Sequence, residues 1–289
     1  LLFLRDTSVL LAAGQRQFEV RLQYQMDDSD TVLARVQNNV FQIGEAKLRQ
    51  RLLLMPLELR YGFSPVTQLF VNVPFGWSNG EVSFLNEDEF NNVGGIGDVS
   101  AGFTRQILDG KGNCPDVLFS FSFSAPTGNS SFASSLSTPG ANLGEGVWSL
   151  TGALTAIHTY DPVVVFYGFG YRHRFEGFFD DPLSDVDLFV NPGSQILYRF
   201  GVGFAINPQI TLSASFLGQY ISEPSVNGVR LAGTIREPMQ VRLAATIVRG
   251  QKTKTYPYGP PGIKFIEPYV NFGLTDAAID SIIGVSVTW

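Results

Sequence analysis

Residues 17–26 read QFEVRLQYQM, and this stretch decides the fold class. Its even-numbered positions carry Phe, Val, Leu, Tyr and Met, whereas its odd-numbered positions carry Gln, Glu and Arg. Successive side chains of a β-strand point to opposite faces of the sheet. The alternation therefore predicts a strand with one apolar face and one polar face.

The same alternation recurs along the chain, for example in 117–125 (VLFSFSFSA) and in the last residues, 281–289. No change of texture or linker divides the sequence into two parts. We predict about twelve strands, with ten or fourteen as alternatives. The predicted strands lie near residues 16–26, 48–63, 68–76, 98–107, 117–125, 147–160, 163–175, 194–205, 210–220, 239–248, 263–274 and 281–289.

The composition of the 289-residue chain is that of a membrane protein without membrane helices. Only 16% of the residues are charged, against about 25% in soluble domains. The longest apolar run, residues 162–171 (PVVVFYGFGY), is half of the roughly 20 residues that a spanning helix needs. The 24 Phe residues argue against disorder. The excess of 26 acidic over 20 basic residues argues against a nucleic-acid partner.

The connections between the predicted strands alternate between long and short. Long connections occupy 27–47, 77–97, 126–146, 176–193 and 221–238; short ones lie at 64–67, 161–162 and 206–209, with a middling one at 108–116. The order breaks only at the last two connections, because the long 221–238 is followed by another long one, 249–262, and then by the short 276–280. Short turns on one side and long loops on the other are typical of outer-membrane barrels. A soluble β-sandwich would also alternate, but it would not sort its loops.

These features predict an all-β fold, a transmembrane antiparallel up-and-down β-barrel. A barrel satisfies every backbone hydrogen bond inside the bilayer. We assign it residues 15–289, with residues 1–14 as an N-terminal segment that lies in the periplasm or plugs the lumen. Aromatic residues fall where interfacial girdles are expected: Phe18, Tyr61, Phe63, Tyr160 and Trp289 on the short-turn side, and Tyr24, Phe75, Trp77, Trp148, Phe175 and Tyr220 on the long-loop side.

The polar faces carry the candidate pore-lining residues. They are Glu19, Arg21, Glu58, Arg60, Arg172, Arg174, Arg199, Arg242 and Glu267, six positive and three negative. Charged rings set ion preference in a narrow barrel, so one interpretation is a weakly anion-favouring pore with Arg172 and Arg174 at the constriction. The other is that Arg and Glu pair across strands and brace a plugged interior.

No residue set predicts an enzyme, a cofactor or a metal site. Both histidines, His158 and His173, fall on the lipid-side positions of their strands, where neither can serve as a base in the lumen. The acidic residues Asp180, Asp181, Asp185 and Asp187 match no calcium-loop spacing and are best interpreted as a solvated loop. The single cysteine, Cys114, lies in a predicted turn, and its role stays open.

Several short motifs resemble the outer-membrane barrel family named for the MetA pathway of phenol degradation. They are residues 9–24 (VLLAAGQRQFEVRLQY), 59–64 (LRYGFS), 73–75 (VPF), 95–103 (GIGDVSAGF), 125–128 (APTG) and 272–276 (FGLTD). The resemblance implies an outer-membrane channel or transporter for small or aromatic solutes. It does not identify the solute.

The last residues, 285–289 (VSVTW), resemble the assembly signal of outer-membrane proteins, with Val285, Val287 and Trp289 as the recognised side chains. Such a signal would act by strand addition at an exposed sheet edge. The signal usually ends in Phe, so the final Trp is a departure. The assembly machinery, outer-membrane lipid and lipopolysaccharide are thus expected partners, and the outer membrane of a Gram-negative-type envelope is the expected location.

Two functions follow from the predicted barrel. The first is a passive channel for small solutes through a polar, arginine-containing lumen. The alternative is a non-conducting barrel that anchors or docks a partner complex through the long loops or residues 1–14.

Overall fold

The computed structural model describes residues 10–37, 40–84, 87–110, 114–129, 142–179, 188–248 and 264–289. Among these, no helix is long and apolar enough to cross a membrane. The strands that build the barrel wall are β1 (Arg16–Gln37), β2 (Val40–Ser64), β3 (Thr67–Phe84), β5 (Val99–Leu108), β6 (Asp116–Ala125), β7 (Ser149–Tyr160), β8 (Val163–Arg174), β11 (Gln195–Asn207), β12 (Ile210–Ile221), β15 (Met239–Val248), β16 (Phe265–Gly273) and β17 (Ser281–Thr288).

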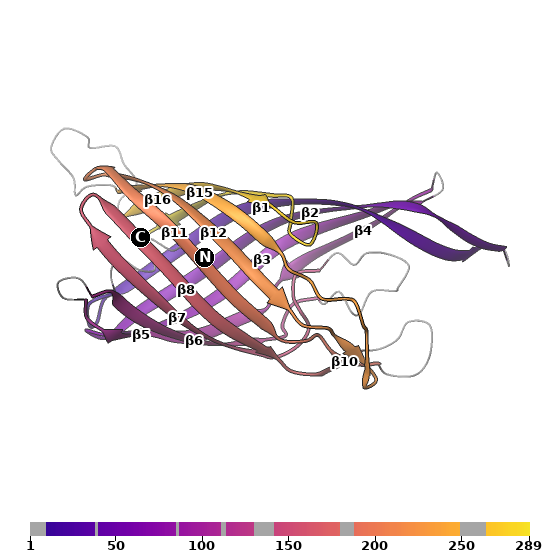
Figure 1. Cartoon of the computed structure of the whole chain (residues 1–289), viewed down its shortest axis with the longest axis horizontal. Helices are drawn as coiled ribbons and strands as arrows, with labels where there is room; N and C mark the ends of the chain where they lie inside the picture. The colour runs from indigo at the N-terminus through magenta and orange to yellow at the C-terminus, as the bar shows by residue number, and fades with distance from the viewer. Residues whose placement is uncertain are drawn as a thin grey trace.

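These strands form a closed antiparallel barrel (Figure 1). Each strand pairs with its neighbours in the chain order, and β1 pairs with the last strand, β17, so that Glu19 lies opposite Thr288. The additional pairing of β2 with β3 closes the ring. The prediction of a twelve-stranded barrel is confirmed, and most strand bounds agree to within two residues.

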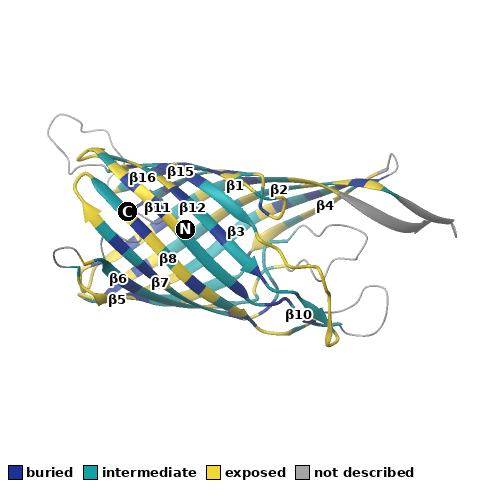
Figure 2. Ribbon diagram, in the orientation of Figure 1, coloured by how far each residue is buried: buried dark blue, intermediate teal, exposed yellow. Residues whose placement is uncertain are grey.

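Burial alternates along the strands, which gives the barrel wall a chequered appearance (Figure 2). On β2 the outward Leu59 is 51% exposed, whereas Arg60 beside it is 7% exposed. On β8 the outward Phe169 is 59% exposed, whereas Phe166 on the inner face is 1% exposed. The wall therefore turns apolar and aromatic side chains outward, as contact with lipid requires, and keeps polar ones inside.

The predicted girdle residues lie mainly on the outer surface. Eight of them are exposed beyond a third of their area: Phe18, Tyr61, Phe63 and Tyr160 on one side, and Tyr24, Trp77, Trp148 and Phe175 on the other. Trp148 stacks on Phe123 with ring centroids 4.8 Å apart, and Phe18 lies 5.9 Å from Trp289.

Three strands extend well beyond the barrel on the long-loop side, which corrects the prediction that 27–47 and 77–97 are loops (Figure 1). β1 and β2 remain paired as far as Gln37 and Val40, and β3 continues in register with β4 (Glu87–Ile96). The prediction was wrong because runs of consecutive polar residues, such as 27–30 (DDSD) and 87–89 (EDE), interrupt the alternation in these segments. They lack the one-sided alternation of a membrane strand, although their backbones pair equally well in water.

Parts of the remaining long connections are also ordered as strands. β9 (Gly177–Phe179), β10 (Leu188–Asn191), β13 (Ser225–Val226) and β14 (Val229–Arg230) form a small second sheet. Its core consists of Val147, Phe179 and Val190, so the loop before β7 packs against the loops that follow β8 and β12. This sheet lies at the long-loop end of the barrel (Figure 1).

Candidate functional site: the lumen and its two ends

One wall of the lumen carries a chain of ion pairs on β1 and β2. Glu19 is 1% exposed and lies 3.4 Å from Arg21 Nη2 through Oε1 and 4.0 Å from Arg60 Nη2 through Oε2. Arg60 Nε also donates to Glu58. β1 and β2 pair with Glu19 opposite Glu58, so Arg60, which contacts both carboxylates, lies between two like charges that the register places side by side.

The neighbouring strands β15 and β16 carry a second, more deeply buried pair. Arg242 Nη2 donates to Glu267 Oε1 at 2.7 Å, and Thr246 Oγ1 donates to Glu267 Oε2 at 2.8 Å. The Arg242 guanidinium also lies 3.8 Å from the centre of the Tyr269 ring. Six of the nine predicted pore-lining residues therefore form opposite-charge contacts on one wall, and their formal charges cancel.

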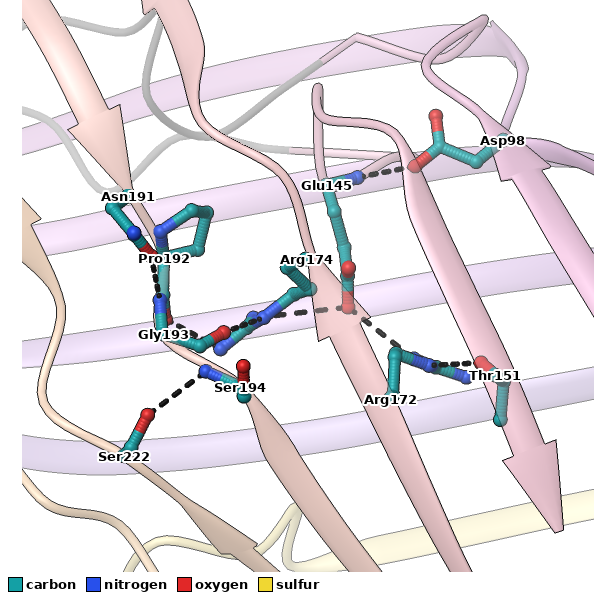
Figure 3. A network of polar contacts seen from close by, with 10 residues as sticks. All are labelled: Asp98, Glu145, Thr151, Arg172, Arg174, Asn191, Pro192, Gly193, Ser194 and Ser222. Atoms are coloured by element: carbon teal, nitrogen blue, oxygen red, sulfur yellow. Dashed lines mark hydrogen bonds and ion pairs between the residues drawn. The ribbon is translucent and has the colours of Figure 1, made fainter.

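The other three residues lie on β8 and β11. Arg199 Nη2 donates to Thr155 Oγ1 at 2.8 Å. Arg172 and Arg174 lie at the long-loop end, where Glu145 approaches both (Figure 3). Glu145 Oε1 is 3.5 Å from Arg172 Nη1 and 3.9 Å from Arg174 Nη1. We call these three residues the mouth cluster. Here two guanidinium groups share one carboxylate.

Asp98 positions Glu145 through the backbone. The Asp98 carboxylate accepts hydrogen bonds from Gly128 N at 3.0 Å and from Glu145 N at 2.6 Å. Burial raises the pKa of this carboxyl above its ordinary value, and the N–H donors limit the rise. A Cβ atom at Gly144 would lie 2.2 Å from Asp98 Oδ1, so this close approach requires glycine there.

At the short-turn end, residues 10–14 run along the inside of the wall. A Cβ atom at Gly62, on the inner face of β2, would lie 2.2 Å from Ala12 O. Gly14 N donates to Gly62 O at 2.8 Å, and Leu11 N donates to Gln68 Oε1 at 3.4 Å. Leu10 packs against the inward cluster of Leu118, Ile157 and Phe166 on the opposite strands.

The residues that the sequence interpretation missed are Glu145 and Asp98. Glu145 stands in the expected loop 126–146 and Asp98 at the very start of the predicted strand 98–107, so alternation gives little information on the direction of either side chain. One signal was available: six positive and three negative charges on the polar faces leave arginines that need acidic partners from outside the strands.

The remaining candidates lie away from the lumen or outside the described residues. His158 stacks on Tyr160 and His173 contacts Phe175, both on the outer face, as predicted. Cys114 is exposed. Asp180, Asp181, Asp185 and Asp187 are not among the described residues. Within the described part of the chain, no group of three potential metal ligands converges.

Comparison with known proteins agrees with this architecture. The profile of the family named for the MetA pathway of phenol degradation matches residues 54–247, about two thirds of the chain. The chain belongs to this family. This confirms the resemblance found in the sequence motifs.

Solved structures with the same fold are outer-membrane barrels. The COG4313 outer membrane channel from Pseudomonas putida F1 superposes with a TM-score of 0.71 at 15% identity, over 97% of this chain and 96% of that one. The translocator domain of the autotransporter NalP from Neisseria meningitidis gives a TM-score of 0.50 at 12% identity, over 96% and 89%. The protein is an outer-membrane β-barrel, as predicted.

Proposed function

We propose that this barrel is a passive channel for small solutes, with an entry at the mouth cluster and a path along the inner wall. The observation that carries the proposal is the uneven distribution of lumen charge. The wall of β1, β2, β15 and β16 is neutral through its ion pairs. The mouth cluster keeps a net positive charge, and its Arg172 side chain is 35% exposed and open to solutes. The fold shared with a protein described as an outer membrane channel supports the same function.

A net positive charge at the mouth favours anions over cations. We expect a potassium chloride gradient across a planar bilayer to give a reversal potential of anion-selective sign. Arg172→Gln removes the exposed positive charge and is expected to bring the permeability ratio close to one. Arg174→Gln is a less clean variant, because Arg174 also donates to Gly193 O and Pro192 O at 2.7 and 2.5 Å.

A matched control for this experiment is Arg49→Gln. Arg49 pairs with Glu81 at 3.3 Å on the exposed face of the extended strands, away from the lumen. This variant should keep the anion preference of the unmodified protein. A bilayer that stays silent for the unmodified protein and for a form lacking residues 1–14 contradicts the channel, and would favour the anchoring barrel.

Residues 10–14 are the proposed plug of this channel. The proposal is supported by the contacts of Leu10 with Leu118, Ile157 and Phe166, which reach across from the β2 side of the lumen to β6, β7 and β8. Passage of a solute at this end then requires the segment to move. Residues 1–9 of the predicted N-terminal segment lie outside the described residues.

We also propose that Val285, Val287 and Trp289 act as the assembly signal. Trp289 N donates to Phe18 O at 2.8 Å, so the last residue continues the β1–β17 ladder that closes the barrel. Trp289→Ala is expected to lower the yield of folded protein in outer-membrane fractions several-fold. Trp148→Ala removes an exposed tryptophan from the other side and serves as the control. Equal yields for the two variants would contradict the signal.

A further inference from the structure

We propose that the mouth cluster is a binding site for the carboxylate of a small organic anion, and that Glu145 occupies this site as an internal ligand. The proposal deepens the proposed channel function, since it names the solute class that the mouth would recognise. A solute carboxylate would replace the Glu145 carboxylate between Arg172 and Arg174. Four observations carry the proposal.

The first observation is that two guanidinium groups converge on one oxygen atom. Arg172 Nη1 and Arg174 Nη1 lie 3.5 and 3.9 Å from Glu145 Oε1 (Figure 3). Both distances exceed the roughly 2.7–2.9 Å of a well-formed hydrogen bond between charged groups. The geometry is that of an anion site whose present occupant fits it loosely.

The second observation is that the two arginines are held without help from Glu145. Arg172 Nε donates to Thr151 Oγ1 at 3.1 Å on the adjacent strand β7. Arg174 is 7% exposed and donates through Nε and Nη2 to the backbone of the Pro192–Gly193 turn, which leaves Nη1 directed at the carboxylate. Gly193 N in turn donates to Asn191 Oδ1 at 3.0 Å. The receptor side is therefore preorganised, which lowers the cost of binding a solute.

The third observation is that Glu145 is held by its backbone and not by its side chain. Its N–H donates to Asp98 Oδ2 at 2.6 Å, whereas its carboxylate makes only the two long contacts described above within the described residues. The side chain can thus rotate away from the arginines while the loop stays attached to Asp98. Exchange of the internal carboxylate for a solute carboxylate needs no unfolding of the loop.

The fourth observation concerns access and charge. The side chains of Glu145 and Arg172 are 36% and 35% exposed, so a solute can reach the contact between them. Arg236 lies close enough to Arg174 to interact with it electrostatically. The three arginines outnumber the two nearby carboxylates of Glu145 and Asp98, so the site keeps a net positive charge that would attract a solute carboxylate.

Calorimetry on the unmodified chain in detergent measures the binding of benzoate. Benzamide, a neutral analogue of the same shape, serves as the control ligand. Removal of the internal carboxylate in Glu145→Gln should raise the affinity for benzoate about five-fold, because a partly exposed ion pair no longer competes. Arg172→Gln should abolish benzoate binding. The affinity for benzamide should be the same in all forms.

Two further variants separate direct competition from a general change in charge. Glu145→Asp keeps the charge but shortens the side chain, so it should raise the affinity for benzoate as Glu145→Gln does. Glu81→Gln breaks the exposed pair with Arg49, away from the mouth, and should leave the affinity unchanged. Heat-modifiable migration on gels verifies that each variant is folded.

The outcomes are distinct. A benzoate affinity that is unchanged or lowered in Glu145→Gln, or raised there but not in Glu145→Asp, overturns the carboxylate site. If the protein conducts in bilayers while this series shows no difference, the site is wrong and the channel stands. If the series behaves as expected but no current is found, the channel is wrong and the site stands.

Discussion

Arg242→Met is expected to lower the free energy of unfolding of the barrel by about 3 kcal/mol, because it leaves a buried carboxylate without its charged partner. Arg242 and Glu267 are 7% and 4% exposed, and their contact is 2.7 Å long. In this variant the Thr246 hydroxyl still donates to Glu267 Oε2. Urea unfolding in detergent micelles, followed by tryptophan fluorescence, measures the change.

The double variant Arg242→Met with Glu267→Gln tests the cause. A neutral amide at position 267 still accepts the Thr246 hydroxyl, and no buried charge is left unpaired, so at least about half of the loss should be recovered. Arg49→Met breaks an exposed pair whose arginine is 47% exposed and should cost less than about 1 kcal/mol. If the double variant is as unstable as the single one, the loss comes from packing of the Arg242 side chain.

Gly62→Ala is expected to release residues 10–14 from the barrel wall and to increase the conductance. The added Cβ atom would lie 2.2 Å from Ala12 O and 2.7 Å from Leu11 O, both backbone atoms that cannot move unless the segment moves. Overpacking of this kind costs about 1–3 kcal/mol. The population of barrels with a displaced segment should therefore rise about tenfold or more. Single-channel recordings measure the open fraction.

Gly152→Ala is the matched control, because a Cβ atom there meets nothing within 4 Å. It should conduct as the unmodified protein does. A form lacking residues 1–14 should be open most of the time and insensitive to Gly62→Ala. If this shortened form conducts no better than the full chain, residues 10–14 do not limit passage and the proposed plug is wrong.

The strands within the membrane could be predicted from the sequence because lipid constrains them. Every second residue must be apolar, so the pattern of β11 or β17 is visible in the sequence without any knowledge of its neighbours. The extended parts of β1, β2 and β3 could not be found in this way. Runs of consecutive polar residues such as 27–30 (DDSD) hide the alternation there, so the strand conformation becomes visible only through cross-strand pairing, for example of Ser83 with Lys47 and with Asp88.

For the candidate site too, the sequence predicted one property of each residue and not another: the face on which it lies, but not its partner. Parity along a strand assigned Arg172, Arg174, Arg242 and Glu267 to one face, and their positions agree with that assignment. The alternation could not predict which arginine pairs with which carboxylate. Arg242 and Glu267 pair because β15 and β16 are neighbours whose register brings them close, and Glu145 reaches the mouth because Asp98 holds its loop there.

Taken alone, the sequence determined the class of fold, the location and the face on which each strand residue lies, because a two-residue period is a local property that lipid on one side enforces. Only the tertiary structure decided that most lumen charges cancel, that a loop carboxylate lies between two arginines, and that residues 10–14 line the inner wall. These features depend on contacts between segments tens to hundreds of residues apart, which no local period encodes.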